Sequence, residues 1–363
     1  MISVATPVKG WFAVNAYALD YSPKKLPTAD FGVAYIGCGG IARAHARAAQ
    51  SLGLRLVACS DLDAGAAEAF AKQFGIPHWT TDYRKMLELP GIDVVEVAIP
   101  PFGRVEAVTA IAESGRHIHI EKPFAHSFED AARMVEAARR HGVRLSVSQN
   151  TRYYPGARAA YELIRAGVLG ELFYLDVRMF GKQERTNTKW YRTIDHFMLV
   201  EWGSHHFDIA RFWAGRPPER VCTLSKRTPG QTFASDMLHT STLDFSGSLM
   251  GVITATDHSA SDSYDYPIRL EGSKAALRGF MRGPLEICTE EARDQWRPVD
   301  LRPITEGPEP IACLLIDFLT SIYTGTPSPQ SGEENLLTVA SYMAAVRSKD
   351  EGNRWVSLRE FGV

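Results

Sequence analysis

The sequence predicts an α/β protein in two parts, a doubly wound parallel sheet followed by an α+β domain with an open, mostly antiparallel sheet. Three observations predict this: strands and helices alternate between residues 31 and 150, a glycine-rich turn follows the first strand, and longer alternating runs begin at residue 172. Strand–helix alternation gives a parallel sheet with helices on both faces. Apolar–polar alternation indicates strands with one exposed face. A length of 363 residues is enough for roughly two domains.

The first part contains short apolar runs separated by Ala-rich segments. The apolar runs predict buried strands at residues 31–37, 54–61, 93–100, 117–123 and 144–150. The segments between them have helical periodicity and predict helices at residues 42–52, 64–75, 104–115 and 128–142.

The second part changes pattern after Pro155. One helix is expected at residues 156–167, and strands are expected at residues 172–180, 220–227, 239–245, 249–259 and 267–273. A late helix at residues 332–352 is expected to return and brace both domains. The expected limits are therefore an N-terminal arm at 1–30, a first domain at 31–150, a substrate-binding and oligomerisation domain at 151–330, and a bracing helix and strand at 331–363.

Composition excludes several classes of protein. The net charge of −2 lacks the basic excess of a nucleic-acid binder, and no apolar run approaches the roughly 20 residues that span a membrane. The five cysteines are odd in number and form no CxxC pair, which favours a reducing cytoplasm. The N-terminus does not have the pattern of a signal peptide. It contains four aromatic residues, Trp11, Phe12, Tyr17 and Tyr21. They predict an arm that packs on the domain or on a neighbouring subunit.

The glycine-rich turn has the pattern of a dinucleotide-binding loop. Gly37, Gly39 and Ala42 fit G-x-G-x-x-A between a strand and a helix. Gly37 permits the tight turn, Gly39 permits backbone approach to a pyrophosphate, and Ala42 permits close helix–strand packing. The helix N-terminus supplies free N–H groups to the phosphates. The first part is therefore predicted to be a Rossmann domain.

An acid at the end of the second strand predicts which dinucleotide binds. Asp61 follows Gly39 by 22 positions, where a carboxylate can bind the ribose hydroxyls. It would repel a 2′-phosphate, and Leu62 beside it supplies no cation. The sequence therefore favours NAD over NADP.

The segment EWGSHHFD, residues 201–208, raises a choice between metal ligands, a proton relay and a polar helix start. If a helix begins near Glu201, then Glu201, His205 and Asp208 share one face while His206 lies on another. Adjacent histidines that diverge are poor ligands for one metal, so no metal site is predicted. A proton relay is the preferred interpretation.

Several motifs in one order carry a resemblance to a known family. GCGGIA (37–42), AIPP (98–101), EKP (121–123), NTRYYP (150–155), ExGxHxxD (201–208) and LEGSKAAL (270–277) occur in that order. With them the chain resembles the glucose–fructose oxidoreductase/inositol dehydrogenase/MocA family from about residue 31 to 358. That family implies a nicotinamide cofactor and hydride transfer at a carbinol carbon of a sugar, glycoside or cyclitol.

The resemblance implies roles for particular residues. Lys122 would contact the reacting oxygen, His205 would be the base and Glu201 would orient it or share its proton. Further cofactor contacts are expected at Gly40, Ile41, Pro100, Glu121 and Lys122, and substrate contacts at Asn150, Arg152, Trp190 and His206. Arg152 could instead be a surface residue, and Trp190 could be core packing.

The sequence also departs from the family pattern. Glu201 stands where Asp is usual, and Pro101 and Arg104 stand where Asn and His are common, which affects the expected pocket shape more than the chemistry. Two other functions stay open, an NAD-dependent glycosidase that oxidises transiently and a non-catalytic sugar sensor on the same fold. A homodimer or homotetramer is expected.

Overall fold

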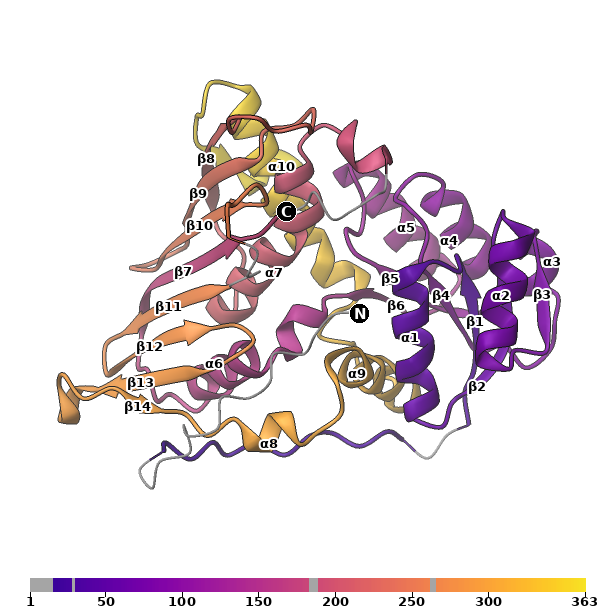
Figure 1. Cartoon of the computed structure of the whole chain (residues 1–363), viewed down its shortest axis with the longest axis horizontal. Coiled ribbons are helices and arrows are strands. Elements are labelled where there is room, and N and C mark those ends of the chain that lie inside the picture. Colours follow the sequence, from indigo (N-terminus) through magenta and orange to yellow (C-terminus); the bar gives the residue numbers. More distant parts are fainter. Residues whose placement is uncertain (1–15, 28–29, 183–188, 262–265) are drawn as a thin grey trace.

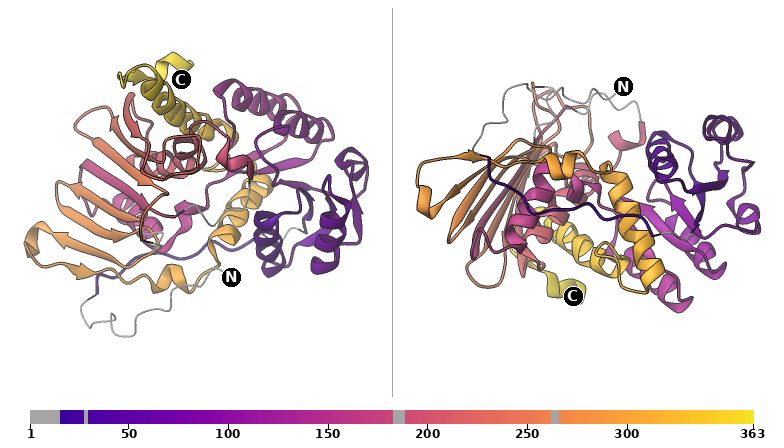
Figure 2. Two further views of the ribbon diagram at one scale, coloured as in Figure 1. Left: turned by 45° about the horizontal axis from the view of Figure 1, so that its top comes forward. Right: turned by 90° about the horizontal axis from the view of Figure 1, so that it is seen from below.

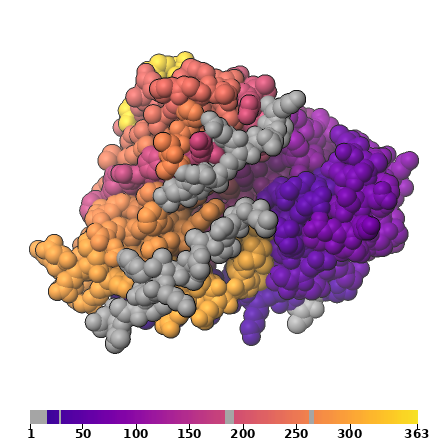
Figure 3. Space-filling model, in the orientation of Figure 1, coloured from indigo at the N-terminus to yellow at the C-terminus, as the bar shows by residue number. Residues whose placement is uncertain are grey.

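The computed structural model describes residues 16–27, 30–182, 189–261 and 266–363, with the side chains of residues 189 and 190 left out. Each of its two parts is built on one sheet, and the two parts lie side by side (Figure 1). The space-filling view shows them as one continuous molecule (Figure 3). Among the described residues, no helix has the length and apolar character needed to cross a membrane.

The first sheet is parallel throughout and has the order β3-β2-β1-β4-β5-β6. Its strands are β1 (Gly32–Ile36), β2 (Arg55–Ser60), β3 (His78–Thr80), β4 (Val94–Val97), β5 (His117–Glu121) and β6 (Leu145–Ser148). The five predicted strands are confirmed, and β3 is the one that the sequence analysis missed. The order reverses between β1 and β4, and ligands of such sheets bind outside the carboxyl ends of the strands at that point.

Helices cover both faces of this sheet. They are α1 (Gly40–Ser51), α2 (Ala64–Phe74), α3 (Tyr83–Leu87), α4 (Arg104–Glu113) and α5 (Phe128–Arg140). Local chemistry sets several ends: Asp63 caps the start of α2, Ser127 caps the start of α5, and Gly75 ends α2 at a φ of 66°. All four predicted helices are confirmed, and the short α3 is additional.

The second sheet has nine strands in the order β14-β13-β12-β11-β7-β10-β9-β8-β15. They are β7 (Leu172–Phe180), β8 (Arg220–Lys226), β9 (Leu238–Asp244), β10 (Met250–Thr256), β11 (Pro267–Gly272), β12 (Ala275–Phe280), β13 (Leu285–Thr289), β14 (Arg297–Pro298) and β15 (Val356–Ser357). Only β7 and β10 pair in parallel; the other neighbours are antiparallel. The predicted mostly antiparallel sheet is confirmed.

Helices lie on one face of the second sheet (Figure 2). The helical elements between β6 and β8 are η1 (Asn150–Tyr153), α6 (Pro155–Arg165), η3 (Lys189–Arg192), η4 (Met198–Trp202) and α7 (Gly203–Ala214). Three short helical elements follow later in the chain, and they are η5 (Glu290–Ala292), α8 (Arg302–Thr305) and η6 (Leu358–Phe361). On the other face, Leu224, Thr240, Thr254 and Arg178 form one row across β8, β9, β10 and β7. No described residue buries this row fully: Leu224, Thr240 and Arg178 are exposed.

Two late helices contact both parts. α9 (Pro310–Thr324) packs on α1 and β6 of the first part, where its apolar side chains share a core with β1, and on η1 at the start of the second part. α10 (Gly332–Asp350) packs on α5 of the first part and on α7 and β8 of the second. The sequence analysis expected α10 but did not single out α9.

The described part of the N-terminal arm packs against later segments of the same chain. The Tyr17 N–H donates to the Pro298 carbonyl (2.8 Å), and the Lys24 ammonium contacts the Asp317 carboxylate (2.6 Å). The Arg158 guanidinium lies over the Tyr21 ring at 5.3 Å. The packed arm is confirmed for these residues, while Trp11 and Phe12 lie outside the described range.

Candidate active site

The glycine loop between β1 and α1 has the geometry that a pyrophosphate needs. Gly37 has a φ of 92°, and a Cβ there would lie 2.6 Å from the Ala98 carbonyl oxygen, so only glycine fits. A Cβ at Gly39 or Gly40 would meet nothing within 4 Å. α1 begins at Gly40 with no side-chain cap. Its first N–H groups are therefore available to an anion.

Asp61 stands directly after β2, beside this loop. Its carboxylate accepts hydrogen bonds from the Cys38 N–H (2.8 Å) and the Asp63 N–H (3.0 Å). Each oxygen keeps a further lone pair for a ribose hydroxyl. The next residue, Leu62, is 93% exposed and brings no positive charge. This arrangement suits NAD, as predicted.

Two other residues expected to contact the cofactor lie at the same edge. Ile41 is 41% exposed in the first turn of α1. Pro100 is exposed in the segment between β4 and α4. Both positions leave the side chain accessible to a bound dinucleotide.

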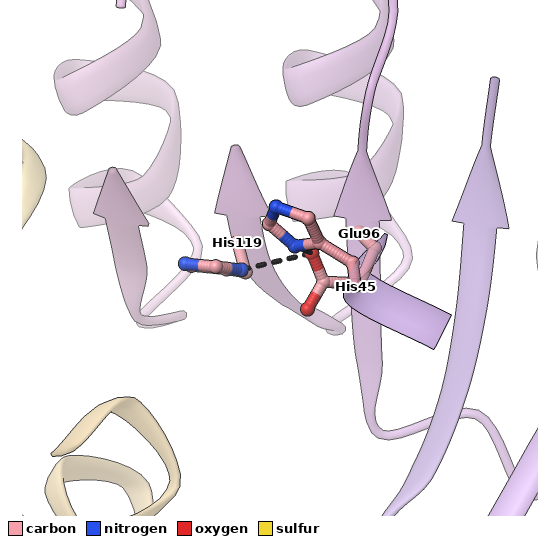
Figure 4. Close-up of side chains that lie close together, drawn as sticks. All are labelled: His45, Glu96 and His119. Carbon is pink, nitrogen blue, oxygen red and sulfur yellow. Dashed lines mark hydrogen bonds and ion pairs between the residues drawn. The ribbon is translucent and has the colours of Figure 1, made fainter. Parts of the chain in front are cut away.

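Glu121 points into the domain instead of toward this edge. Its carboxylate lies 2.9 Å from His45 Nε2. The other nitrogen of His45 lies 2.9 Å from Glu96, which also contacts His119 Nδ1 at 2.8 Å (Figure 4). The expected cofactor role of Glu121 therefore has no support from its side-chain contacts, because the carboxylate is used in an interior network.

The buried network is best described as a protonated His45 held between the carboxylates of Glu96 and Glu121. Burial would lower the pKa of His45, but Glu96 and Glu121 raise it to about 10. Burial would raise the pKa of Glu96, but His119 and His45 lower it to about 2. The ligating atoms of His45, Glu96 and His119 lie within 4.8 Å of one another, near enough for a metal ion. An imidazolium between two carboxylates already satisfies both nitrogens of His45. Sequence reasoning missed this cluster, since its members are far apart in the chain.

Lys122 follows β5 and connects the two parts. Its ammonium donates to the main-chain oxygen of Glu201 (3.3 Å) and lies 5.6 Å from the Trp202 ring centroid. Both partners belong to η4, in the second part of the chain. The predicted meeting of Lys122 with the EWGSHHFD segment is thus present in the structure.

Arg104 holds the turn that carries Lys122. The side chain is buried in the first turn of α4 and donates to the Ile99 carbonyl after β4 (2.9 and 2.7 Å). It also donates to the carbonyls of Glu121 (2.5 Å) and Pro123. Burial lowers the pKa of Arg104 to about 10, which still leaves it charged at neutral pH. The departure from the family at this position therefore supplies a brace between two strand ends.

Glu201 does not contact His205 as the sequence analysis expected. Its carboxylate lies 2.8 Å from His126 Nε2, and His205 Nδ1 is buried without a hydrogen-bond partner among the described residues. The expectation assumed an α-helix from Glu201 onward. Residues 198–202 instead form a π-helical turn, and α7 begins only at Gly203. The wider turn changes the direction of Glu201 relative to α7.

His205 and His206 are both buried beside positive charge. Burial, together with Lys122, His206 and Arg282, lowers the pKa of His205 well below its ordinary value. Burial, His239 and Lys122 lower the pKa of His206 to about 3. Neither ring nitrogen of His206 has a hydrogen-bond partner among the described residues. Both imidazoles are therefore neutral at pH 7, with nitrogens available to a ligand.

The other expected substrate residues differ in their surroundings. Asn150 Oδ1 is buried without a partner among the described residues, so it remains a candidate. Arg152 is buried and not at the surface: it makes two 2.6 Å bonds to Asp208 and a 2.8 Å bond to the Pro329 carbonyl. With its guanidinium used in this way, Arg152 has a structural role. The side chain of Trp190 lies outside the described residues.

Family models match both parts of the chain. Residues 31–149 match "Oxidoreductase family, NAD-binding Rossmann fold", and residues 157–278 match "GFO/IDH/MocA C-terminal domain". The chain belongs to the Gfo/Idh/MocA oxidoreductase family. Its first part is an NAD-binding Rossmann domain, and the resemblance inferred from the motifs is confirmed.

Named members of the Gfo/Idh/MocA family are similar over nearly the whole chain. A D-apiose dehydrogenase from Paraburkholderia graminis is 27% identical over 348 residues, covering 91% of this chain and 90% of that protein. A myo-inositol 2-dehydrogenase from Thermotoga maritima is 25% identical over 336 residues, covering 90% and 98%. An oxidoreductase from Agrobacterium radiobacter, solved with NAD+, L-tartaric acid and magnesium, has a TM-score of 0.83 at 22% identity and covers 92% and 99%. That structure supports the fold alone.

Proposed function

We propose that this protein is an NAD-dependent dehydrogenase that oxidises or reduces a CH–OH group of a sugar, glycoside or cyclitol. The observation that carries the proposal is the contact between Lys122, at the carboxyl edge of the NAD-binding sheet, and η4 of the second part. It supports a site at this edge, because the Lys122 ammonium also lies near enough to the His205 imidazole to lower the pKa of that histidine. The named activities of the apiose and inositol dehydrogenase relatives support this substrate class.

The charge of each residue determines its role in the proposed reaction. NAD, when bound, accepts or returns the hydride. Lys122 supplies a positive charge that stabilises the developing oxyanion. His205, kept neutral by burial and nearby positive charge, accepts the hydroxyl proton. Glu201 contacts Lys122 through its main-chain oxygen and holds its own carboxylate against His126.

Support for the enclosed character of the site comes from burial. His205 and Glu201 are 7% and 4% exposed. Electrostatic stabilisation of an oxyanion is stronger where water is excluded. A reaction that separates a hydride from a proton benefits from such surroundings.

We further propose a reducing cytoplasmic location and a homodimer or homotetramer. All five cysteines are free in the structure, which suits a reducing compartment. The open face of the second sheet supports self-association, since it exposes Leu224 (49%) and Met250 (46%).

The experiment is a screen of free sugars, glycosides, aldonates and inositols for NADH formation, with mass analysis of the products. Stoichiometric NADH and a product two mass units lighter are expected for at least one free sugar or cyclitol. Lys122→Ala is the control, with turnover lowered on the order of 10²–10³ and NAD affinity retained. Bond cleavage without net NADH would replace the dehydrogenase by the glycosidase function. Ligand binding without either reaction would favour a sensor.

A further inference from the structure

His126 is the one histidine that contacts a carboxylate of the candidate site, within the described residues, and also reaches solvent. Its Nε2 lies 2.8 Å from Glu201 Oε1. The His126 side chain is 25% exposed, whereas that of Glu201 is 5% exposed. His126 lies in the segment between β5 and α5, and its ring packs edge-on against Phe102, which is 62% exposed. The pair therefore leads from the buried site to the surface.

The other groups near Glu201 come from four elements and have different contacts. Arg104 of α4, Tyr191 of η3 and Tyr342 of α10 lie within electrostatic range of its carboxylate, and Lys122 after β5 donates to its main-chain oxygen (3.3 Å). The Arg104 guanidinium donates to main-chain carbonyls, and the Tyr342 hydroxyl donates to the Ala125 carbonyl (2.6 Å). Among these neighbours, His126 is the imidazole that both contacts the Glu201 carboxylate and reaches solvent.

The proposed reaction requires a route for a proton. When a CH–OH group is oxidised, the carbon loses a hydride with both electrons of the C–H bond, and the oxygen loses one proton. The hydride is accepted by the nicotinamide, but the proton has to leave a buried site in every turnover. His205 is 7% exposed, and its Nδ1 has no partner among the described residues that could pass the proton onward.

We propose that Glu201 and His126 form the proton exit of this site, an inference that rests on the proposed dehydrogenase function. The proton that His205 accepts passes through one intervening water to the Glu201 carboxylate, and Glu201 passes it from Oε1 to the unprotonated Nε2 of His126. The resulting imidazolium gives one proton to water, and Glu201 and His126 return to the carboxylate and the neutral imidazole. One proton enters and one leaves, and no electrons move. In the reductive direction the same steps run in reverse. His126 is thus a positioning and proton-transfer residue that does not touch the substrate.

The test compares two substitutions that separate hydrogen bonding from proton transfer. His126→Gln keeps an amide donor for Glu201 but cannot carry a proton, and His126→Ala removes both properties. His196→Ala is the matched control, since His196 also pairs with a carboxylate, Asp350, at 3.3 Å and has a side chain that is 23% exposed. NAD affinity, measured by calorimetry, should be unchanged in all three variants.

The decisive readout follows NADH absorbance and a pH indicator together in a single turnover. In the wild type, proton release to the solution should keep pace with NADH formation. In His126→Gln it should lag behind, and steady-state turnover should fall on the order of 10-fold, less than the range of about 10²–10⁴ for a group that takes the proton directly. Added imidazole should shorten the lag in His126→Ala in proportion to its concentration.

Three results would overturn the proposal. They are proton release that keeps pace with NADH in His126→Gln, a lag that imidazole does not shorten, and full activity of His126→Gln with loss only in His126→Ala. The last would make His126 a hydrogen-bonding support for Glu201 and nothing more. If the wild type forms no NADH from any sugar or cyclitol, the dehydrogenase function itself fails, and that result is distinct from these three.

Discussion

Lys122 and Glu201 meet at 3.3 Å, one at the end of β5 and the other in the π-helical turn before α7. The contact joins the carboxyl edge of the NAD-binding sheet to the helix that carries His205. It places the ammonium group where it lowers the pKa of that histidine, in addition to the effect of burial. A cation and a neutral base are thereby held together by residues 79 positions apart in the chain.

Asp61 is predicted to determine the preference for NAD. Asp61→Ala should weaken NAD binding on the order of 10- to 100-fold, since a hydrogen bond to a charged group contributes about 1.5–3 kcal/mol. It should also narrow the advantage of NAD over NADP. Calorimetry with both cofactors measures this, and Glu68→Ala, an exposed acid on α2, is the control. Tighter binding of NADP than NAD by the wild type would refute this role for Asp61.

Arg152 is predicted to act on stability and not on substrate binding. Its two bonds to the fully buried Asp208 make a paired internal charge. Arg152→Ala should destabilise the fold by about 3–5 kcal/mol, because the buried Asp208 would lose its ion-pair partner and keep the Thr338 hydroxyl (3.0 Å) as a neutral donor. Urea unfolding measures the loss. Normal stability combined with a raised KM would instead assign Arg152 to the substrate.

The open face of the second sheet is predicted to bury itself against another copy of the chain. The row that contains Leu224 and Thr240 is exposed in the described part of the chain. Leu224→Lys should shift the assembly toward smaller species in light scattering, because a charge would have to be buried at the interface. Lys72→Ala on α2, far from this face, is the control. A monomeric wild type at micromolar concentration would contradict the prediction.

Stability is predicted to fall in mild acid. Burial lowers the pKa of His239 to about 4, and burial, His239 and Lys122 lower that of His206 to about 3. The unfolded chain binds these protons at about pH 6.5. Each group therefore supports the fold above about pH 6.5, and this support is lost as the pH falls toward the folded value.

A substitution tests the acid effect directly. Each such histidine should contribute a slope of up to about 1.4 kcal/mol per pH unit. His239→Gln should reduce the slope by that amount in urea unfolding between pH 7 and 5. His141→Gln, an exposed histidine after α5, should leave the slope unchanged. An identical slope in His239→Gln and the wild type would show that burial of this imidazole does not drive the acid loss.

Periodicity and turn chemistry predicted most of the first domain. The five long strands and four helices follow from apolar runs, caps and glycines that act within a few residues. β3 was not predicted, because its three residues, His78–Thr80, are largely exposed and lack an apolar pattern. α9 was not predicted, because its burial depends on α1 and β1, which are far away in the sequence.

The site was predicted in outline but not in its contacts. The residue types Lys122 and His205 follow from motifs, whereas the direction of Glu201 depends on a π-helical turn that spacing alone does not reveal. His126 stands only four positions after Lys122, and its closeness to EKP was the available signal. The role of Arg152 required knowledge of Asp208 across the fold. Contacts between distant segments decided the roles of His126 and Arg152, whereas a local π-helical turn decided the direction of Glu201.

The measurement that tests the account most directly is turnover of His205→Ala on the substrate found by the screen. The account predicts a loss of about 10²–10⁴, the range for a positioned base, with NAD affinity unchanged. In the wild type, the acid limb of the pH–rate profile that belongs to this group should lie well below the ordinary range of histidine, and it should vanish in the variant. Turnover of His205→Ala close to that of the wild type would contradict the assignment of the base and, with it, the proposed arrangement of the site.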